Sequence, residues 1–226
     1  MKDPNDLIAG FRRFRDKYLG AGPEFFQRLA SGGQAPKVMI IACCDSRVDP
    51  AIVLDCDPGD LFVVRNVANL VPPCEEGGGY HGTSAALEFA VSCLHVEHII
   101  VMGHAQCGGI RALLGDNFGC DTEASFIAPW MSIVAAARQQ VANSSADIDS
   151  KAAACETAAI GISLENLKSF PFVRDAVTRG TLALHGWYFD IERGELLAYE
   201  VAEKRFQPLV GVPDALDDAA DRSALA

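Results

Sequence analysis

Short continuous apolar runs alternate along this chain with segments whose apolar residues recur at helical intervals. One run extends from Val38 to Cys43, and another from His98 to His104. Short β-branched runs without helical periodicity are typical of strands that are buried on both faces of a parallel sheet. Three more strands are predicted, at 61–65, 181–190 and 196–201.

In the segments between these runs, apolar residues recur at helical intervals. Apolar residues in 7–18 fall on one face of a predicted amphipathic helix, with arginines off that face and Gly20 as its stop. Further helices are predicted at 23–29, at 83–94 and over most of the alanine-rich stretch 121–170. Because strands and helices alternate, the strands should be joined by right-handed parallel crossovers.

These elements predict an α/β fold: a mostly parallel central sheet flanked by helices, with about four parallel strands plus an antiparallel edge strand. The edge strand is 196–201, which a turn at 192–195 folds back as a hairpin. One domain is expected over 1–213, with 1–30 as an N-terminal helical arm. The residues that follow, 214–226, are predicted to form an acidic and poorly ordered tail.

Composition narrows the choice of partners and compartment. The chain has 226 residues and a formal net charge of −11, which argues against nucleic acid or an anionic membrane as a partner because both require a basic surface. No apolar run approaches the roughly 20 residues of a membrane span, and the first residues lack a signal-peptide core. We therefore expect a cytoplasmic protein that acts on a small molecule.

Both apolar runs end in residues that can bind a metal. Cys43 is followed by Asp45 and Arg47, and His104 is followed three residues later by Cys107. Alternate residues of an extended chain share a face, so Asp45 and Arg47 should point to the same side as Cys43. If the two strands are neighbours, Cys43, His104 and Cys107 converge outside the carboxyl edge of the sheet. A zinc ion with three protein ligands keeps a fourth position open, which is the catalytic arrangement.

Each of these residues alone has an ordinary structural explanation. A cysteine that ends a strand is usually a small buried hydrophobe, an Asp45–Arg47 pair is commonly a surface ion pair, and His104 could be a core histidine. The combination of two strand ends, His-x-x-Cys spacing and adjacent glycines favours a metal site. Eight cysteines fit thiols and ligands better than a disulfide framework, and the default prediction for five of them is a buried thiol: Cys56, Cys74, Cys93, Cys120 and Cys155.

The motifs C-x-D-S-R at 43–47 and H-x-x-C-G-G at 104–109 make the chain resemble the β-class carbonic anhydrases, most closely their plant-type branch. The resemblance extends from about Gln34 to Glu200. It implies a zinc enzyme, with one Zn²⁺ per chain held by two cysteines and a histidine, that converts carbon dioxide reversibly to bicarbonate and a proton. It also implies a homodimer or a higher homo-oligomer, in which helices such as 7–18 pack across the dimer.

The resemblance implies roles for further residues. Asp45 would accept a hydrogen bond from the zinc-bound water, and Arg47 would keep it ionised and oriented. The carbon dioxide pocket would be formed by Gln34, Phe62, Val67, Phe89 and Gly108. The chain departs from the pattern at Cys44, where the family often has serine, and at Phe89, where plant members have tyrosine.

Two other functions remain open, namely hydrolysis of carbonyl sulfide or carbon disulfide on the same fold, and a non-catalytic zinc or thiol-redox regulator. Regulation is a separate question. Some bacterial members close at low pH with a bicarbonate held by a tryptophan, an arginine and a tyrosine, and these positions fall on Ile40, Arg65 and Phe189. Since only the arginine is present, a bound bicarbonate would lack partners. We expect an open site at neutral pH, with Asp45 on Arg47.

Overall fold

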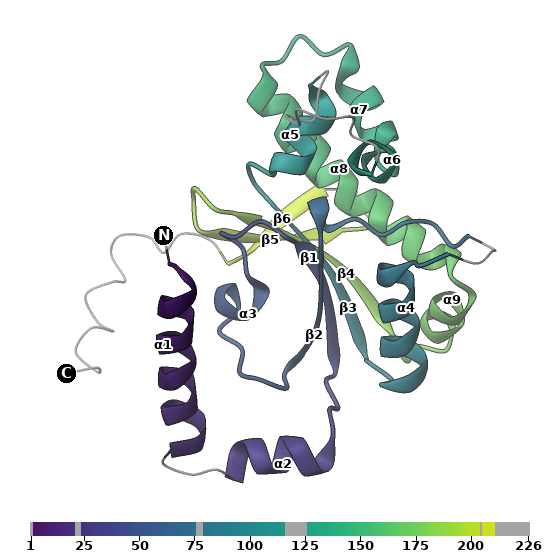
Figure 1. Ribbon diagram of the computed structural model, residues 1–226. Coiled ribbons are helices and arrows are strands. Elements are labelled where there is room, and N and C mark those ends of the chain that lie inside the picture. The colour runs from purple at the N-terminus through teal and green to yellow at the C-terminus, as the bar shows by residue number, and fades with distance from the viewer. Residues whose placement is uncertain (1, 21–23, 76–78, 116–125, 204, 211–226) are drawn as a thin grey trace.

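The computed structural model describes residues 2–20, 24–75, 79–115, 126–203 and 205–210. Within these residues, six strands form one sheet in the order β2-β1-β3-β4-β5-β6 (Figure 1). Strands β2, β1, β3 and β4 run parallel, and β5 and β6 are antiparallel to their neighbours. The strands are β1 (Val38–Cys43), β2 (Leu61–Asn66), β3 (His98–His104), β4 (Ala183–Asp190), β5 (Glu195–Glu200) and β6 (Arg205–Val210).

The predicted fold class is confirmed, with one strand more than predicted. Strand β6 pairs with β5 and lies at the edge of the sheet. Its sequence contains Pro208, which cannot donate a ladder hydrogen bond and therefore argues against a strand in a sequence pattern. An edge position tolerates such a residue, because only one side of the strand has to be paired.

Helices cover the two faces of the sheet unequally (Figure 1). On one face, residues of α4, α8 and α9 pack against alternate β1 and β3 side chains such as Met39 and Val101. The other face carries Ile40 and Met102, with α3 beside it. The helices are α1 (Pro4–Arg15), α2 (Glu24–Gly32), α3 (Pro50–Val53), α4 (Gly82–Glu88), α5 (Gly108–Leu114), α6 (Ile127–Ser132), α7 (Ala135–Ala142), α8 (Ile148–Ser169) and α9 (Pro171–Thr178).

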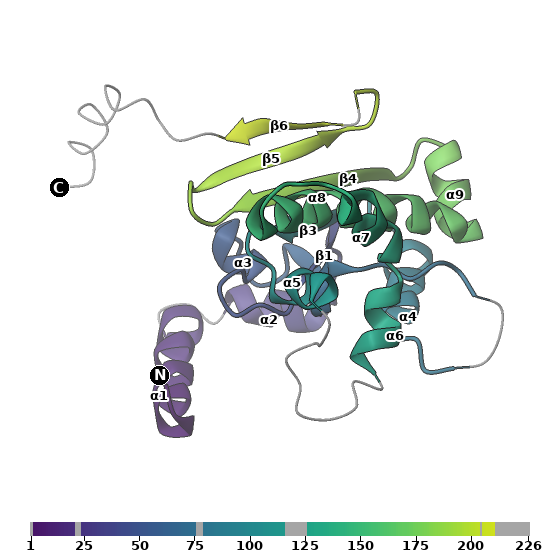
Figure 2. The ribbon, with the colours of Figure 1, turned by 90° about the horizontal axis from the view of Figure 1, so that it is seen from above.

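Helix α1 stands apart from the sheet (Figure 2). It begins with a capping box between Asp3 and Asp6, and none of its residues is buried. Its apolar face is left open, with Leu7 and Phe11 more than half exposed. The helix is amphipathic as predicted, but the described part of this chain leaves most of its apolar face uncovered.

Two predictions fall on residues whose structure is not described. The acidic tail at 214–226 lies outside the described residues, and so does Cys120. Among the helices that are described, none combines the length and hydropathy required to cross a lipid bilayer.

Candidate active site

The three expected metal ligands meet at the carboxyl edge of the sheet. Cys43 is the last residue of β1, His104 is the last residue of the neighbouring β3, and Cys107 precedes the first turn of α5. All three side chains are buried, and their ligand atoms lie within 4.8 Å of one another. The sulfur atoms of Cys43 and Cys107 are 3.9 Å apart. The predicted convergence is therefore confirmed.

His104 is oriented as a metal ligand would be. Its Nδ1 lies 2.9 Å from the carbonyl oxygen of Ala105. Because a carbonyl can only accept, Nδ1 carries the proton and Nε2 presents a lone pair. Among the described side chains, this Nε2 is buried without a hydrogen-bond partner, a state that proteins usually avoid. A borderline divalent ion such as Zn²⁺ fits two sulfur atoms and one imidazole nitrogen.

The pKa values of the three candidate ligands are shifted by their mutual contacts. The hydrogen bond with Cys107 lowers the pKa of Cys43 to about 4, although burial opposes this shift. The same hydrogen bond, together with burial, raises the pKa of Cys107. Burial alone would lower the pKa of His104, but the neighbouring Cys43 outweighs it and raises that pKa. A metal binds cysteine as thiolate, so its binding here would release the thiol protons.

Asp45 and Arg47 form a close pair beside the ligands. Arg47 donates from Nε to Oδ1 of Asp45 at 3.0 Å and from Nη2 to Oδ2 at 2.8 Å. These hydrogen bonds lower the pKa of Asp45 well below its ordinary value, so the carboxylate stays ionised. Its Oδ2 lies 4.0 Å from Nε2 of His104. The expected pairing of Asp45 with Arg47 is confirmed, and Cys44 is exposed.

Arg65 has a structural role that the sequence did not reveal. Its Nε donates to the carbonyl oxygen of Cys43 at 2.9 Å, and its Nη2 donates to that of Asp45 at 2.7 Å. The remaining Nη1 forms an ion pair with Asp49 at 2.7 Å. Arg65 on β2 therefore fixes the segment that follows β1. All three of its nitrogens donate to acceptors within the chain.

Glu156 is another residue to which sequence analysis gave no role. Its carboxylate is buried, accepts the backbone N–H of Cys107 and the hydroxyl of Tyr188, and has a pKa that burial raises. Burial likewise raises the pKa of Tyr188. The signal in the sequence was a glutamate on the face of α8 that carries the small apolar residues Ala152 and Ala159.

The expected substrate residues do not assemble in one chain. Val67 and Gly108 lie near the ligands, since Val67 follows β2 and Gly108 follows Cys107. Gln34 lies before β1, and Phe62 is near the start of β2, where its ring centroid is 6.0 Å from that of Phe89. Residue 66, not Phe62, is the partner of Cys43. Four residues of strand separate the two positions, roughly 13 Å.

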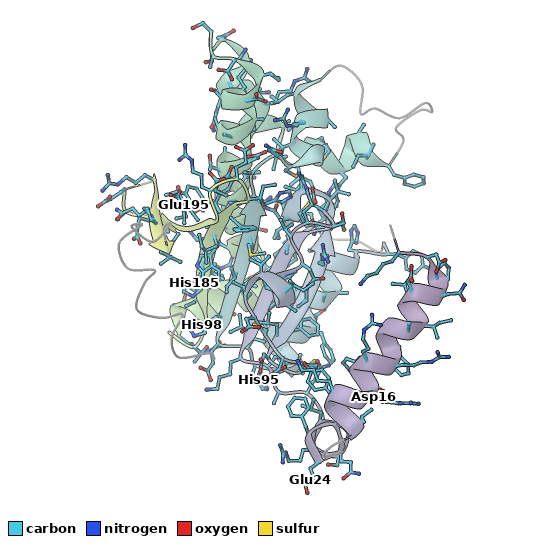
Figure 3. All side chains as sticks on the ribbon, turned by 90° about the vertical axis from the view of Figure 1, so that its left-hand side faces the viewer. Asp16, Glu24, His95, His98, His185 and Glu195 are labelled. Atoms are coloured by element: carbon cyan, nitrogen blue, oxygen red, sulfur yellow. The ribbon has the colours of Figure 1, made fainter. Side chains whose placement is uncertain are left out.

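The other described histidines and cysteines do not belong to this cluster. His98 and His185 lie side by side on β3 and β4, with Nδ1 of the first 3.2 Å from Nε2 of the second (Figure 3). Burial, followed by the charge of His98, lowers the pKa of His185. The prediction of buried thiols is confirmed for Cys155 but is wrong for Cys74 and Cys93, which are exposed. Cysteine in a loop or on an outward helix face has no core to enter.

Two adjacent parallel strands that present a Cys–His–Cys cluster at their carboxyl ends define an α/β metalloenzyme site. A model of the carbonic anhydrase family matches residues 38–196. The chain is 36% identical over 198 residues to β carbonic anhydrase 3 of Arabidopsis thaliana, which covers 86% of this chain and 76% of that protein.

Solved structures agree with this match. The β-carbonic anhydrase CcaA superposes with a TM-score of 0.82 at 34% identity, covering 90% of this chain and 98% of that one. A tetrameric β-carbonic anhydrase of Sordaria macrospora has a TM-score of 0.68 at 30% identity, with 92% and 94% covered. The chain belongs to the carbonic anhydrase family, in its β class, and its reaction is the reversible hydration of carbon dioxide.

Proposed function

We propose that this chain hydrates carbon dioxide at one zinc ion held by Cys43, His104 and Cys107. The observation that carries the proposal is the buried, unpartnered Nε2 of His104, which lies beside the sulfur atoms of Cys43 and Cys107. An ion bound there would supply Lewis acidity, which makes water a nucleophile near neutral pH. With two thiolates its charge is largely cancelled, so neighbouring residues have to contribute to the reaction.

Asp45 and Arg47 are the catalytic residues in this proposal. The carboxylate of Asp45 stays ionised and can only accept hydrogen bonds, so it orients the proton of a water molecule that reacts beside His104. Arg47 binds both oxygens of Asp45 and also donates to the carbonyl oxygen of Gln106 at 3.0 Å. Arg47 thereby links the segment that follows Cys43 to the segment that carries His104 and Cys107.

We also propose that a second copy of the chain completes the site in a homo-oligomer. Gln34, Phe62 and Phe89 lie at the end of the sheet opposite the metal ligands, so a pocket containing both sets requires two chains. The open apolar face of α1 offers a surface for such an association. In an isologous dimer each chain would give its pocket residues to the site of its partner.

Substrate choice can be tested directly. Zinc-loaded protein is assayed by stopped-flow for carbon dioxide hydration, and in parallel for sulfide release from carbonyl sulfide and carbon disulfide. We expect rapid hydration of carbon dioxide and far slower sulfide release. Faster release of sulfide would assign the site to the sulfur substrates, and a zinc-loaded protein that turns over none of the three would support a regulator instead.

A further inference from the structure

A buried carboxylate lies behind the cluster of metal ligands. Glu156 of α8 is 4% exposed, and its Oε1 accepts the backbone N–H of Cys107 at 2.8 Å. Its Oε2 accepts the hydroxyl of Tyr188, on β4, at 2.8 Å. Three segments that are distant in the sequence therefore meet at one carboxylate, and one of them carries a ligand.

The backbone around Cys107 needs an external anchor. Gln106 has a left-handed conformation, with φ of 58°, and two glycines follow Cys107. Glycines add conformational freedom, and a non-glycine residue at positive φ is held there only by its surroundings. Local sequence alone would leave the direction of the Cys107 side chain poorly fixed.

Helix α5 cannot provide this anchor itself. Cys107 is its N-cap residue, yet the thiol makes no capping hydrogen bond and faces Cys43 instead. In a capping box a glutamate at the third helical position binds the N–H of the N-cap residue, but here that position is Ile110. Glu156 supplies the missing acceptor from another helix.

If the side chain at position 156 only filled space in the core, an apolar residue would be less costly to bury than glutamate. The neighbours of Glu156 on the buried face of α8 include Ala152, Ala159 and Ile160, and an unpaired carboxylate among them would be strongly unfavourable. Both oxygens of Glu156 are matched by donors. The presence of a carboxylate here is therefore explained by its hydrogen bonds to Cys107 and Tyr188, and not by packing.

We infer that Glu156 is a positioning residue for the metal site. It fixes the backbone of Cys107 so that the sulfur atom stays beside that of Cys43, and Tyr188 locks the carboxylate in the orientation this requires. The inference rests on the proposed metal site and adds a residue from α8 to it.

The test measures metal binding in purified full-length variants. Zinc affinity is determined by chelator competition, and the geometry of the site by the absorption spectrum of the cobalt(II)-substituted protein. Glu156→Ala should lower zinc affinity by about 10- to 100-fold and shift the cobalt spectrum, the usual scale for groups that orient ligands. Glu156→Gln keeps an acceptor for the N–H of Cys107 and should recover most of that loss.

Ser163→Ala is a matched control, because Ser163 is also buried on α8 and its hydroxyl accepts the N–H of Val71 at 3.2 Å, on another segment. It should lower stability but keep wild-type affinity and spectrum. If Glu156→Ala does not fold, Tyr188→Phe removes one of the two partners of the carboxylate and should weaken zinc binding several-fold.

The outcomes separate this inference from the proposed function. If the wild-type protein binds no zinc, the proposed function fails. If the wild type binds zinc and Glu156→Ala, or Tyr188→Phe in its place, matches Ser163→Ala in affinity and spectrum, only the positioning role is overturned. Failure of Glu156→Gln to bind zinc better than Glu156→Ala would also overturn it.

Discussion

The carboxylate of Asp45 lies between the Arg47 side chain and His104. Whether the site is open depends on which of the two it pairs with. It accepts two hydrogen bonds from the Arg47 side chain and lies 4.0 Å from Nε2 of His104. Paired with Arg47, it leaves the space beside the histidine open to substrate. The site therefore stays open to substrate only while the Asp45–Arg47 ion pair is intact.

Substitution of Asp45 tests its orienting role. Asp45→Asn keeps the size of the side chain but removes its charge, and its amide group can donate a proton where an acceptor is needed. We expect zinc to be retained while turnover falls by about 10- to 100-fold. Stopped-flow hydration and metal analysis measure both. Ser46→Ala, at the exposed neighbouring position, is the control, and full turnover in zinc-loaded Asp45→Asn would exclude the role.

The pH dependence follows from the same pair. The pKa of Asp45 is lowered in the folded chain, so the stability that this group contributes is present above its ordinary pKa of 3.8 and is lost only as the pH falls through the lowered value. Between pH 6 and 9, roughly the range of the assay, Asp45 does not titrate. Activity should therefore fall on acidification as a single protonation at the reaction centre.

A pH profile of hydration with and without added bicarbonate measures this. The expected curve has the slope of one proton, and bicarbonate should not make it steeper. A multi-proton loss of activity, or cooperativity with bicarbonate, would contradict the assignment of Arg65 to Cys43, Asp45 and Asp49.

At the scale of elements, the site depends on two adjacent strand ends, and a side chain from a third strand fixes the segment that follows one of them. Strands β1 and β3 were predictable because their β-branched runs end abruptly in polar residues. The link from Arg65 was not, since its partners lie 16 to 22 residues away and no local pattern encodes them. The predicted helix at 83–94 is divided, with a π-helical segment at Phe89–Cys93.

Replacement of Arg65 tests this link. Arg65→Lys keeps the charge but has a single nitrogen, which cannot reach two carbonyl oxygens and a carboxylate at once. We expect the free energy of unfolding to fall by about 1–3 kcal/mol, the scale of a lost hydrogen bond to a charged group. Denaturant unfolding measures it. Arg193→Lys, at an exposed ion pair, should change stability little, and equal stability of the two variants would argue against the link.

At the scale of the whole molecule, the two sets of residues in the proposed site lie at opposite ends of the sheet in one chain. The metal ligands lie at the carboxyl edge, while Gln34, Phe62 and Phe89 lie toward the other end. A resemblance could name the pocket residues, but a single sequence does not say which copy of the chain supplies them. Strand direction, which separates the two sets, became decisive only in the folded structure.

Complementation between variants tests a shared site. Cys43→Ala should be inactive for lack of metal, and the double variant Gln34→Ala, Phe89→Asp should be inactive for lack of a pocket; Gln34 and Phe89 are both exposed, so the fold should survive. A hybrid dimer contains one site with both intact halves. Random co-assembly makes about half of the dimers hybrid, so the co-expressed mixture should have about a quarter of wild-type activity. No recovery in hybrids shown to be mixed would place the whole site within one chain.

The most direct measurement is a zinc titration of the metal-free protein during carbon dioxide hydration. The account predicts that activity is absent without metal, rises in proportion to zinc and stops at one equivalent per chain. Cys44→Ala should follow the same curve, while Cys43→Ala, His104→Ala and Cys107→Ala should bind no zinc and stay inactive. Hydration by the metal-free protein, or zinc retained in Cys43→Ala but lost in Cys44→Ala, would contradict the account.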